Sequence, residues 1–264
     1  MADPVWKIGE RGGPSPRAYR LALAAYHASY SSWVRRVLAQ VEAANPVPPM
    51  DIVTALVSGS PPQPPSVARL VTVNLPAAQA ASRVARRGIP RALLDQAGIP
   101  PIDLSSIETA TLRAWAADGL GYVQAIPAER LPVLADRLTQ RVIAGDRWET
   151  IREIVSEELG ADWPRLDLIA QDQVAKLNGR VTEALQQEAG ITSYTWRASR
   201  DGRVRATHRA VDGLVWTWAE GAPDVGFYGE RSHPGQAGRC RCTAEPVLPE
   251  WFRADSCAHG RRLR

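Results

Sequence analysis

The sequence predicts an α+β protein: a mainly helical N-terminal region followed by a small module with a few short antiparallel strands. Up to about residue 189, apolar side chains recur at three- and four-residue steps, which is typical of amphipathic helices. After Gly190 the pattern changes to alternation over 192–197 and 214–218, which is typical of strands. We expect a third strand over 240–245, with Pro246 near its end.

The first helix is expected to begin near Pro16, with Ser15 as its cap, and to end before the proline-rich segment 46–49. The clearest helical pattern runs over 165–189 and includes an acid and a base four residues apart, Asp172 and Lys176. Between these two helices we predict helices over 50–58, 66–86, 90–97, 105–117, 127–143 with Pro127 in its first turn, and from a capping box at Asp146–Glu149 to about 159.

The segment 59–65 is rich in proline and marks either an extended linker or a surface loop within one helical domain. With it as an internal linker, we divide the chain into a helical arm region over 1–120, a second domain over 121–248 and a basic tail over 249–264.

Charge is concentrated at the C-terminal end. Residues 195–264 hold 12 Arg against 8 acidic residues, whereas the first 194 residues are balanced. This asymmetry indicates either a polyanionic partner or a solvated basic tail. We expect no membrane span, since no stretch approaches ~18 apolar residues, and no secretion signal. The three cysteines all follow residue 239 and form no disulfide framework, which suits a reducing compartment.

Cys240 and Cys242 are two residues apart, so they would lie on one face of an extended segment while Arg241 points away. Two thiols with nitrogens that His208 and His233 could supply would suit a tetrahedral zinc ion, and we predict His208, Cys240 and Cys242 as its ligands. The alternative is that both cysteines are small buried side chains on the core side of a strand. A disulfide between them is disfavoured by geometry.

Two interpretations of Asp201, Arg205 and His208 stay open. In a nuclease, Asp201 would polarise His208 as a general base, and Arg205 and Arg241 would clamp phosphate. In a structural role, Asp201 and Gly202 form a turn while the arginine and histidine bind neighbouring carbonyls and acids. No complete catalytic motif supports the first interpretation. Nucleic acid would be contacted by Arg203, Arg205, Arg239 and Arg241.

Four patches in a fixed order resemble the phage head morphogenesis family, also called the phage Mu protein F-like minor capsid proteins. They lie at 168–179, 190–197, 201–213 and 233–248. The tail with Cys257 and His259 lies outside this resemblance. The residues that carry the pattern are Asp172, Lys176, Asn178, Trp196, Asp201, Arg205, His208, Asp212, Gly213, Pro234, Cys240, Arg241 and Cys242.

The resemblance implies a component of a phage virion that is not primarily an enzyme. Such a protein joins the procapsid in few copies through the portal and influences head assembly, genome packaging or delivery. The implied partners are the portal protein, the major capsid or scaffold proteins and packaged double-stranded DNA, with assembly in the host bacterial cytoplasm. The alternatives are a metal-dependent nuclease and a zinc-stabilised DNA-binding module.

Overall fold

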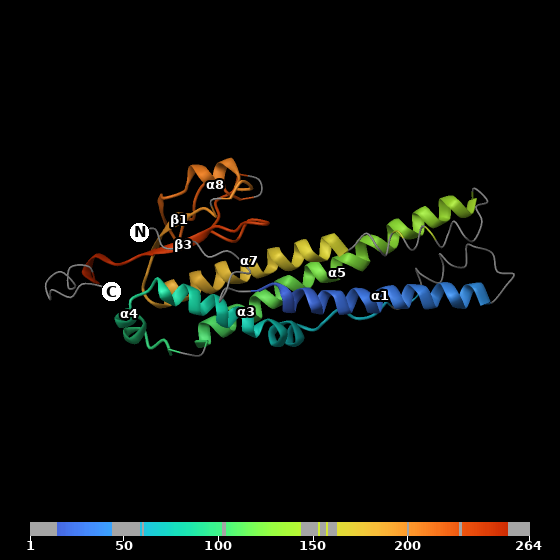
Figure 1. Cartoon of the computed structure of the whole chain (residues 1–264), viewed down its shortest axis with the longest axis horizontal. Helices are drawn as coiled ribbons and strands as arrows, with labels where there is room; N and C mark the ends of the chain where they lie inside the picture. The colour runs from blue at the N-terminus through green and yellow to red at the C-terminus, as the bar shows by residue number, and fades with distance from the viewer. Residues whose placement is uncertain are drawn as a thin grey trace. The chain divides into compact units, whose positions relative to one another are not determined.

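The computed structural model describes residues 15–43, 59, 61–101, 104–143, 153, 157, 163–199, 201–226 and 229–252. A mainly helical region precedes a small antiparallel sheet that includes one short helix between its strands, so the predicted α+β class is confirmed (Figure 1). The elements are α1 (Arg17–Ala43), α3 (Val67–Arg87), α4 (Arg91–Gln96), α5 (Ser106–Ile143), α7 (Trp163–Glu188), β1 (Ser193–Arg197), α8 (Ala206–Ala210), β2 (Val215–Thr217) and β3 (Thr243–Val247).

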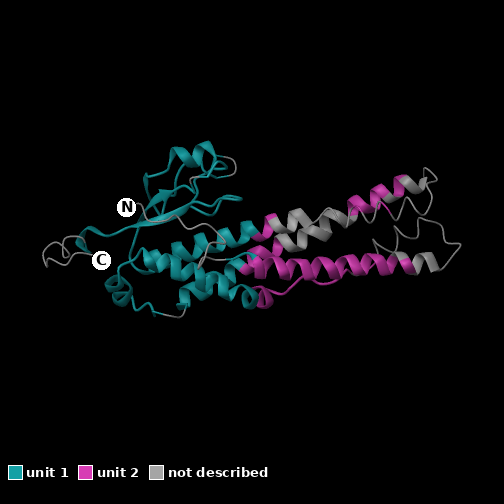
Figure 2. Ribbon diagram, viewed as in Figure 1, with its two compact units in different colours: residues 1–16, 71–115, 171–264 teal, residues 17–70, 116–170 magenta. Residues whose placement is uncertain are grey.

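The chain forms two compact units that are not consecutive in sequence (Figure 2). One combines residues 1–16, 71–115 and 171–264, and the other combines 17–70 and 116–170. No helix in the described part of the chain has both the length and the apolar composition that a membrane crossing needs.

In the unit of 17–70 and 116–170, α1 buries the apolar stripe that the sequence predicts. The side chains of Tyr19, Leu23, Tyr26, Tyr30 and Val34 are all buried. Because these residues recur at three- and four-residue steps, they lie along one side of the helix. The stripe is therefore the buried face of α1.

The predicted break between 117 and 127 is wrong, because α5 runs without interruption from Ser106 to Ile143 and Pro127 lies inside it. A proline disturbs only the turn that precedes it, and buried residues on both sides, such as Trp115 and Leu134, favour one continuous helix. The start of α5 is a reciprocal capping box. The Ser105 amide donates to Glu108 Oε2 at 2.7 Å, and the Glu108 amide donates to Ser105 Oγ at 3.2 Å.

The predicted helices over 66–86, 90–97 and 165–189 are confirmed as α3, α4 and α7. The segment 61–66, which directly precedes α3, contains neither helix nor strand, as expected for its prolines. The predicted helix over 50–58 and the capping box at 146–149 lie outside the described residues, as does most of the tail from 249 onward.

The sheet has the order β2-β1-β3, with β1 antiparallel to both neighbours. In register, Tyr194 lies opposite Trp216 on one side and opposite Pro246 on the other. Pro246 is tolerated because β3 is an edge strand. The third strand begins at Thr243, not at Cys240 as predicted, because a turn occupies the preceding residues. In that turn Arg239 has a φ of 59° and the Cys240 amide bonds to the Ala237 carbonyl at 2.9 Å.

The core of this small module is built from its aromatic residues. Trp196 and Tyr194 are fully buried, Trp218 is nearly so, and Trp216 packs against them. The interpretation of these tryptophans as core is confirmed, while Phe227 lies outside the described residues. A second cluster joins α4 and the C-terminal end of α7 through Leu93, Leu185 and Ile191.

Candidate metal centre and its framework

His208, Cys240 and Cys242 form a buried group in the small module. His208 Nδ1 lies 3.5 Å from the sulfur of each cysteine, and the three possible ligand atoms all lie within 4.8 Å of one another. The exposed fractions of the three residues are 2%, 3% and 5%. Among the residues that the structure describes, this is the group of His, Cys, Asp and Glu side chains whose spacing suits a metal ion.

Two segments that are far apart in sequence bring the group together: α8 carries His208, and the residues just before β3 carry both cysteines. His208 lies on α8, and its Nε2 atom is 3.0 Å from the carbonyl oxygen of Val225. Since a carbonyl only accepts, Nε2 must carry the hydrogen, and a neutral imidazole then keeps its lone pair on Nδ1, toward the two sulfurs. The Trp196 ring packs edge-on against the imidazole, with ring centroids 5.4 Å apart.

The two thiols are electrostatically coupled. The pKa of Cys240 is well below its usual value, because Cys242 donates a hydrogen bond to its sulfur and because the Gly235 amide also favours the thiolate. The pKa of Cys242 is raised by that neighbouring thiolate and by burial. The Ser199 amide and the Trp196 indole act in the opposite direction on Cys242, although the indole N–H makes no full hydrogen bond within the described residues.

The prediction that both cysteines point the same way while Arg241 points away is confirmed, although these residues are not in a strand. Arg241 donates to Asp201 Oδ1 at 2.9 Å and contacts its Oδ2 at 2.5 Å. His233 is not part of the group, because its Nδ1 atom is 3.0 Å from the hydroxyl of Tyr194. The predicted set of His208, Cys240 and Cys242 is thus brought together, whereas a set that includes both histidines is not.

Asp201 and His208 do not form the pair that a general base would need. Asp201 accepts from the Arg203 amide at 2.9 Å as well as from Arg241. Burial would raise the pKa of Asp201, but these hydrogen bonds and the charge of Arg241 outweigh it and lower that pKa. Arg205 donates to the Gly238 carbonyl at 2.6 Å. The contacts are those of the structural interpretation: a turn held by side chains.

The family-motif residues of α7 hold the loop that carries the cysteines. Asp172 pairs with Lys176 at 2.8 Å and accepts from the Arg239 amide at 2.5 Å. This bond stabilises the left-handed conformation of Arg239, which a non-glycine residue rarely adopts. Asn178 lies on the same helix, but its buried Oδ1 atom accepts no hydrogen bond from the described residues.

Gly179 allows the His-Pro-Gly turn to lie directly on α7. A Cβ atom on Gly179 would come within 2.7 Å of the Pro234 carbonyl oxygen. On the other side, Gly235 has a φ of 85°, and a Cβ there would lie 3.1 Å from the Ala175 carbonyl oxygen. Both glycines are thus required by a contact between two backbones.

Asp212 and Gly213 link the end of the segment between β1 and β2 back to β1 and the residue that follows it. Asp212 accepts from the Ala198 amide at 2.9 Å. Gly213, with a φ of 82°, donates its amide to the Trp196 carbonyl at 2.8 Å. These bonds connect the end of α8 to β1 and so fix where His208 lies.

Sequence reasoning missed Gln186, which links α7 to the sheet. Its Nε2 donates to the Ala244 carbonyl at 3.0 Å, and its Oε1 accepts from Trp218 Nε1 at 3.1 Å. The available signal was a polar residue beside the apolar stripe of a helix.

Gln236 was also missed. It accepts from the His233 amide and donates to Glu183, on the rim of a groove of about 640 Å³ between α5 and α7.

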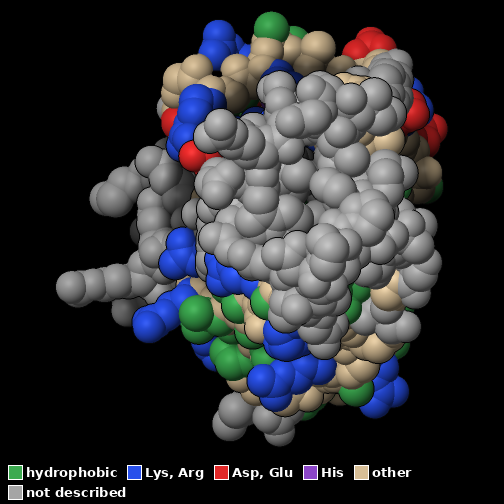
Figure 3. Space-filling view, turned by 90° about the vertical axis from the view of Figure 1, so that its right-hand side faces the viewer, with side chains coloured by type: hydrophobic (Ala, Val, Ile, Leu, Met, Phe, Trp, Pro, Cys, Tyr) green, Lys and Arg blue, Asp and Glu red, His purple; other side chains and the backbone are tan. Residues whose placement is uncertain are grey.

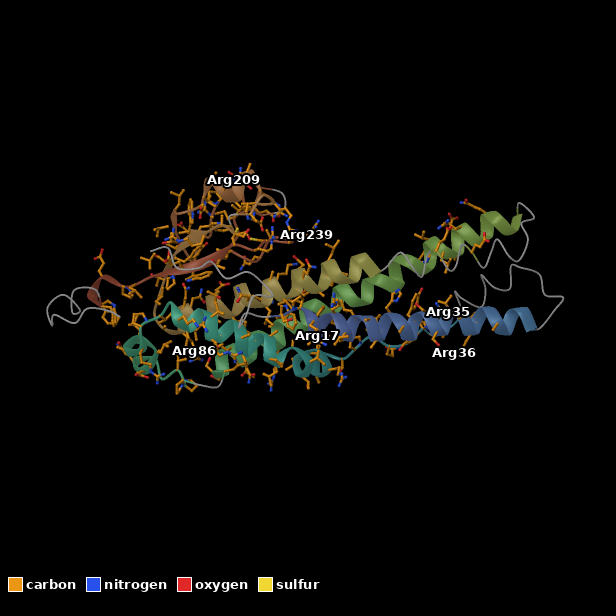
Figure 4. The ribbon with its side chains drawn as sticks, viewed as in Figure 1. Arg17, Arg35, Arg36, Arg86, Arg209 and Arg239 are labelled. Carbon is orange, nitrogen blue, oxygen red and sulfur yellow. The ribbon has the colours of Figure 1, made fainter. Side chains whose placement is uncertain are left out.

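The four arginines predicted to contact nucleic acid are not equivalent. Arg203, Arg205 and Arg239 are exposed and Arg241 is partly buried, but the guanidinium groups of Arg205 and Arg241 are engaged in the contacts above. Arg209 on α8 is exposed as well, and Figure 4 labels it together with Arg239. On the face drawn in Figure 3, Lys and Arg side chains occur in several separate groups.

Comparison with known proteins finds a similarity over most of the second half of the chain. Residues 133–245 match the family described as Phage Mu protein F like protein. Over 140 residues the chain is 30% identical to an uncharacterized protein of Haemophilus influenzae, an alignment that covers 53% of this chain and 30% of that protein. The chain thus spans about a third of the length of the curated relative it matches, and no solved structure matches it. Residues 133–245 therefore resemble a Phage Mu protein F-like domain.

Proposed function

We propose that this chain is a minor head protein of a tailed bacteriophage, which joins the procapsid at the portal and acts in genome packaging or delivery. The observation that carries the proposal is the match of residues 133–245 to the Phage Mu protein F-like family. The four sequence patches fall in the expected order and overlap that range. On this account the protein is a component of the mature virion.

The contacts of the motif residues support a structural component rather than an enzyme. Asp172, Asp201 and Asp212 accept hydrogen bonds from backbone amides, and Arg205 donates to a backbone carbonyl. His208 is buried against two thiols. A nuclease would need such groups to converge on substrate, whereas here they fix the conformation of their own module.

Docking on the portal is proposed for the helical unit of 17–70 and 116–170. The aromatic stripe of α1 is already buried, so it is not the docking surface. Leu21 on α1 and Val133 on α5 are large apolar residues that are 59% and 49% exposed. Exposed apolar side chains on helices are the usual anchors for another helical protein.

A pull-down with the portal protein of the same phage tests this proposal. Full-length chain is expected to bind, and Leu21→Glu with Val133→Glu is expected to weaken binding at least tenfold, because two apolar anchors become charged. Ala92→Glu, at an exposed position of α4 in the other unit, is the control and should bind normally. Binding that is equal in all three proteins would contradict the docking surface, and no binding by any of them would contradict the portal partner.

A further inference from the structure

We propose that His208, Cys240 and Cys242 bind one zinc ion, which holds the small module together. The inference goes beyond the proposed role in the phage head and does not depend on it. It rests on the spacing of the three ligand atoms, on the hydrogen bonds around them and on the segments that they connect.

The ligand atoms are already spaced as ligands of one ion. Zinc binds a thiolate at about 2.3 Å and an imidazole nitrogen at about 2.0–2.1 Å, so a nitrogen and a sulfur on a tetrahedral ion are about 3.6 Å apart. The distances from His208 Nδ1 to the sulfurs of Cys240 and Cys242 are both 3.5 Å. Both nitrogen–sulfur distances are therefore those of ligands on one ion.

The outer contacts are those that support metal ligands. A metal-bound histidine usually donates its other ring N–H to a carbonyl or carboxylate. His208 does this, with Nε2 at 3.0 Å from the Val225 carbonyl oxygen. The Gly235 amide donates to the Cys240 sulfur at 3.3 Å, as expected for a thiolate that carries negative charge.

A hydrogen-bonded cluster without metal satisfies these groups less well. Nδ1 has one lone pair but faces two sulfurs, so it can accept from only one thiol. The other S–H must turn to a sulfur, which is a weak acceptor. A cation at the centre binds all three atoms at once.

The identity of the ion follows from the ligands. Two thiolates with one imidazole favour zinc over the hard cations, which take oxygen ligands. Among the described residues, these three side chains make up the group of possible ligands. The fourth position of a tetrahedral ion is then open to water. Because all three residues are buried, we assign the ion a structural role rather than a hydrolytic one.

A metal would connect α8 to the residues before β3, which lie outside the strands of the sheet. The cysteines precede β3, and His208 lies on a five-residue helix between β1 and β2. The module's three strands are only five, three and five residues long. Small cores of this kind are often held by a structural metal.

Metal analysis of the full-length chain, purified under reducing conditions, tests the proposal. We expect one zinc per chain, and after exchange for cobalt we expect the absorption bands of thiolate-bound cobalt. Cys240→Ser with Cys242→Ser should lose both signals. His208→Cys should keep the metal, because it replaces one zinc ligand by another, and this variant separates ligation from a purely structural histidine. His233→Gln is the control that should keep one zinc, since His233 contacts Tyr194.

A chelator provides a readout that does not depend on variants. It should lower the melting temperature of the wild-type chain, and zinc should restore it. A zinc-free chain that is folded and whose melting temperature responds to neither chelator nor zinc would overturn the proposal. So would zinc that the double cysteine variant, still folded, retains in full.

Discussion

The Gly179 residue of α7 lies so close to the Pro234 carbonyl that a Cβ on the glycine would be 2.7 Å from that oxygen. Real Cβ atoms essentially never approach so closely, and the contact is with backbone, which cannot rotate away. This approach seats the turn that precedes Cys240 and Cys242 on the helix. The two motif patches, far apart in sequence, are therefore one structural element.

Gly179→Ala is expected to destabilise the module by roughly 1–3 kcal/mol, because the helix and the turn must separate to admit a methyl group. Chemical unfolding measures the change. Gly121→Ala is the matched control, since Gly121 is an exposed helical glycine with nothing within 4 Å of its Cβ position. That variant should gain ~0.5–1 kcal/mol from its better helix propensity. Equal effects of the two substitutions would contradict the close approach.

Gln186→Ala is expected to cost roughly 2–4 kcal/mol, because it leaves the Trp218 indole N–H and the Ala244 carbonyl buried without a partner. Thermal or chemical unfolding again measures the loss. Gln187→Ala, which changes the exposed neighbour, should alter stability by no more than about 0.5 kcal/mol. If Gln186→Ala were as mild as its control, the bridge between α7 and the sheet would not be a stabilising contact.

The sequence was sufficient for the helices whose apolar stripe is long and regular. In α1 and α7 burial follows the three- and four-residue steps, so periodicity and structure agree. It was insufficient at Pro127, because a proline signals a helix start only where the chain turns, and here burial on both sides of it maintains one helix. The local sequence pattern does not distinguish a proline that starts a helix from a proline inside a continuous one.

In the candidate site, the sequence predicted the common direction of Cys240 and Cys242, because alternation along an extended segment needs only their spacing. It also predicted His208 as their companion, but it did not show why His233 stays apart. That choice depends on α8, a helix of five residues, and on the Tyr194 hydroxyl, which comes from the central strand. Contacts between segments so far apart in sequence have no local signature.

His233 predicts a pH dependence of stability. Burial lowers the pKa of His233, and Tyr194 is positioned to donate its hydroxyl hydrogen to the neutral ring. The burial of Tyr194 raises the pKa of that hydroxyl, so it stays protonated. A histidine whose pKa is lower in the folded state stabilises the fold above its unfolded pKa of about 6.5, and this contribution is lost as the pH falls toward the folded value.

Thermal unfolding between pH 7.5 and pH 5 checks this dependence. The melting temperature of the wild-type chain should fall more over this interval than that of His233→Gln, which cannot titrate. Parallel curves for the two proteins would show that the histidine is not held neutral by its site.

Exposed arginines of the small module should contribute to DNA affinity without sequence preference. For Arg203→Ala with Arg239→Gly, we expect weaker binding to double-stranded DNA and a salt dependence whose slope is smaller by about two. Glycine at 239 removes the charge while suiting the φ of 59° at that position, so stability should not fall. Arg91→Ala, which removes an exposed arginine that already pairs with Asp95, is the control and should leave the slope unchanged. An unchanged slope in the double variant would exclude these arginines as phosphate contacts.

The most direct test of the head-protein account is quantitative mass spectrometry of purified, mature virions of the phage that encodes this chain. The account predicts that the protein is present in a few copies per particle, in fixed proportion to the portal protein. Its absence both from virions and from procapsids isolated during assembly would contradict the account.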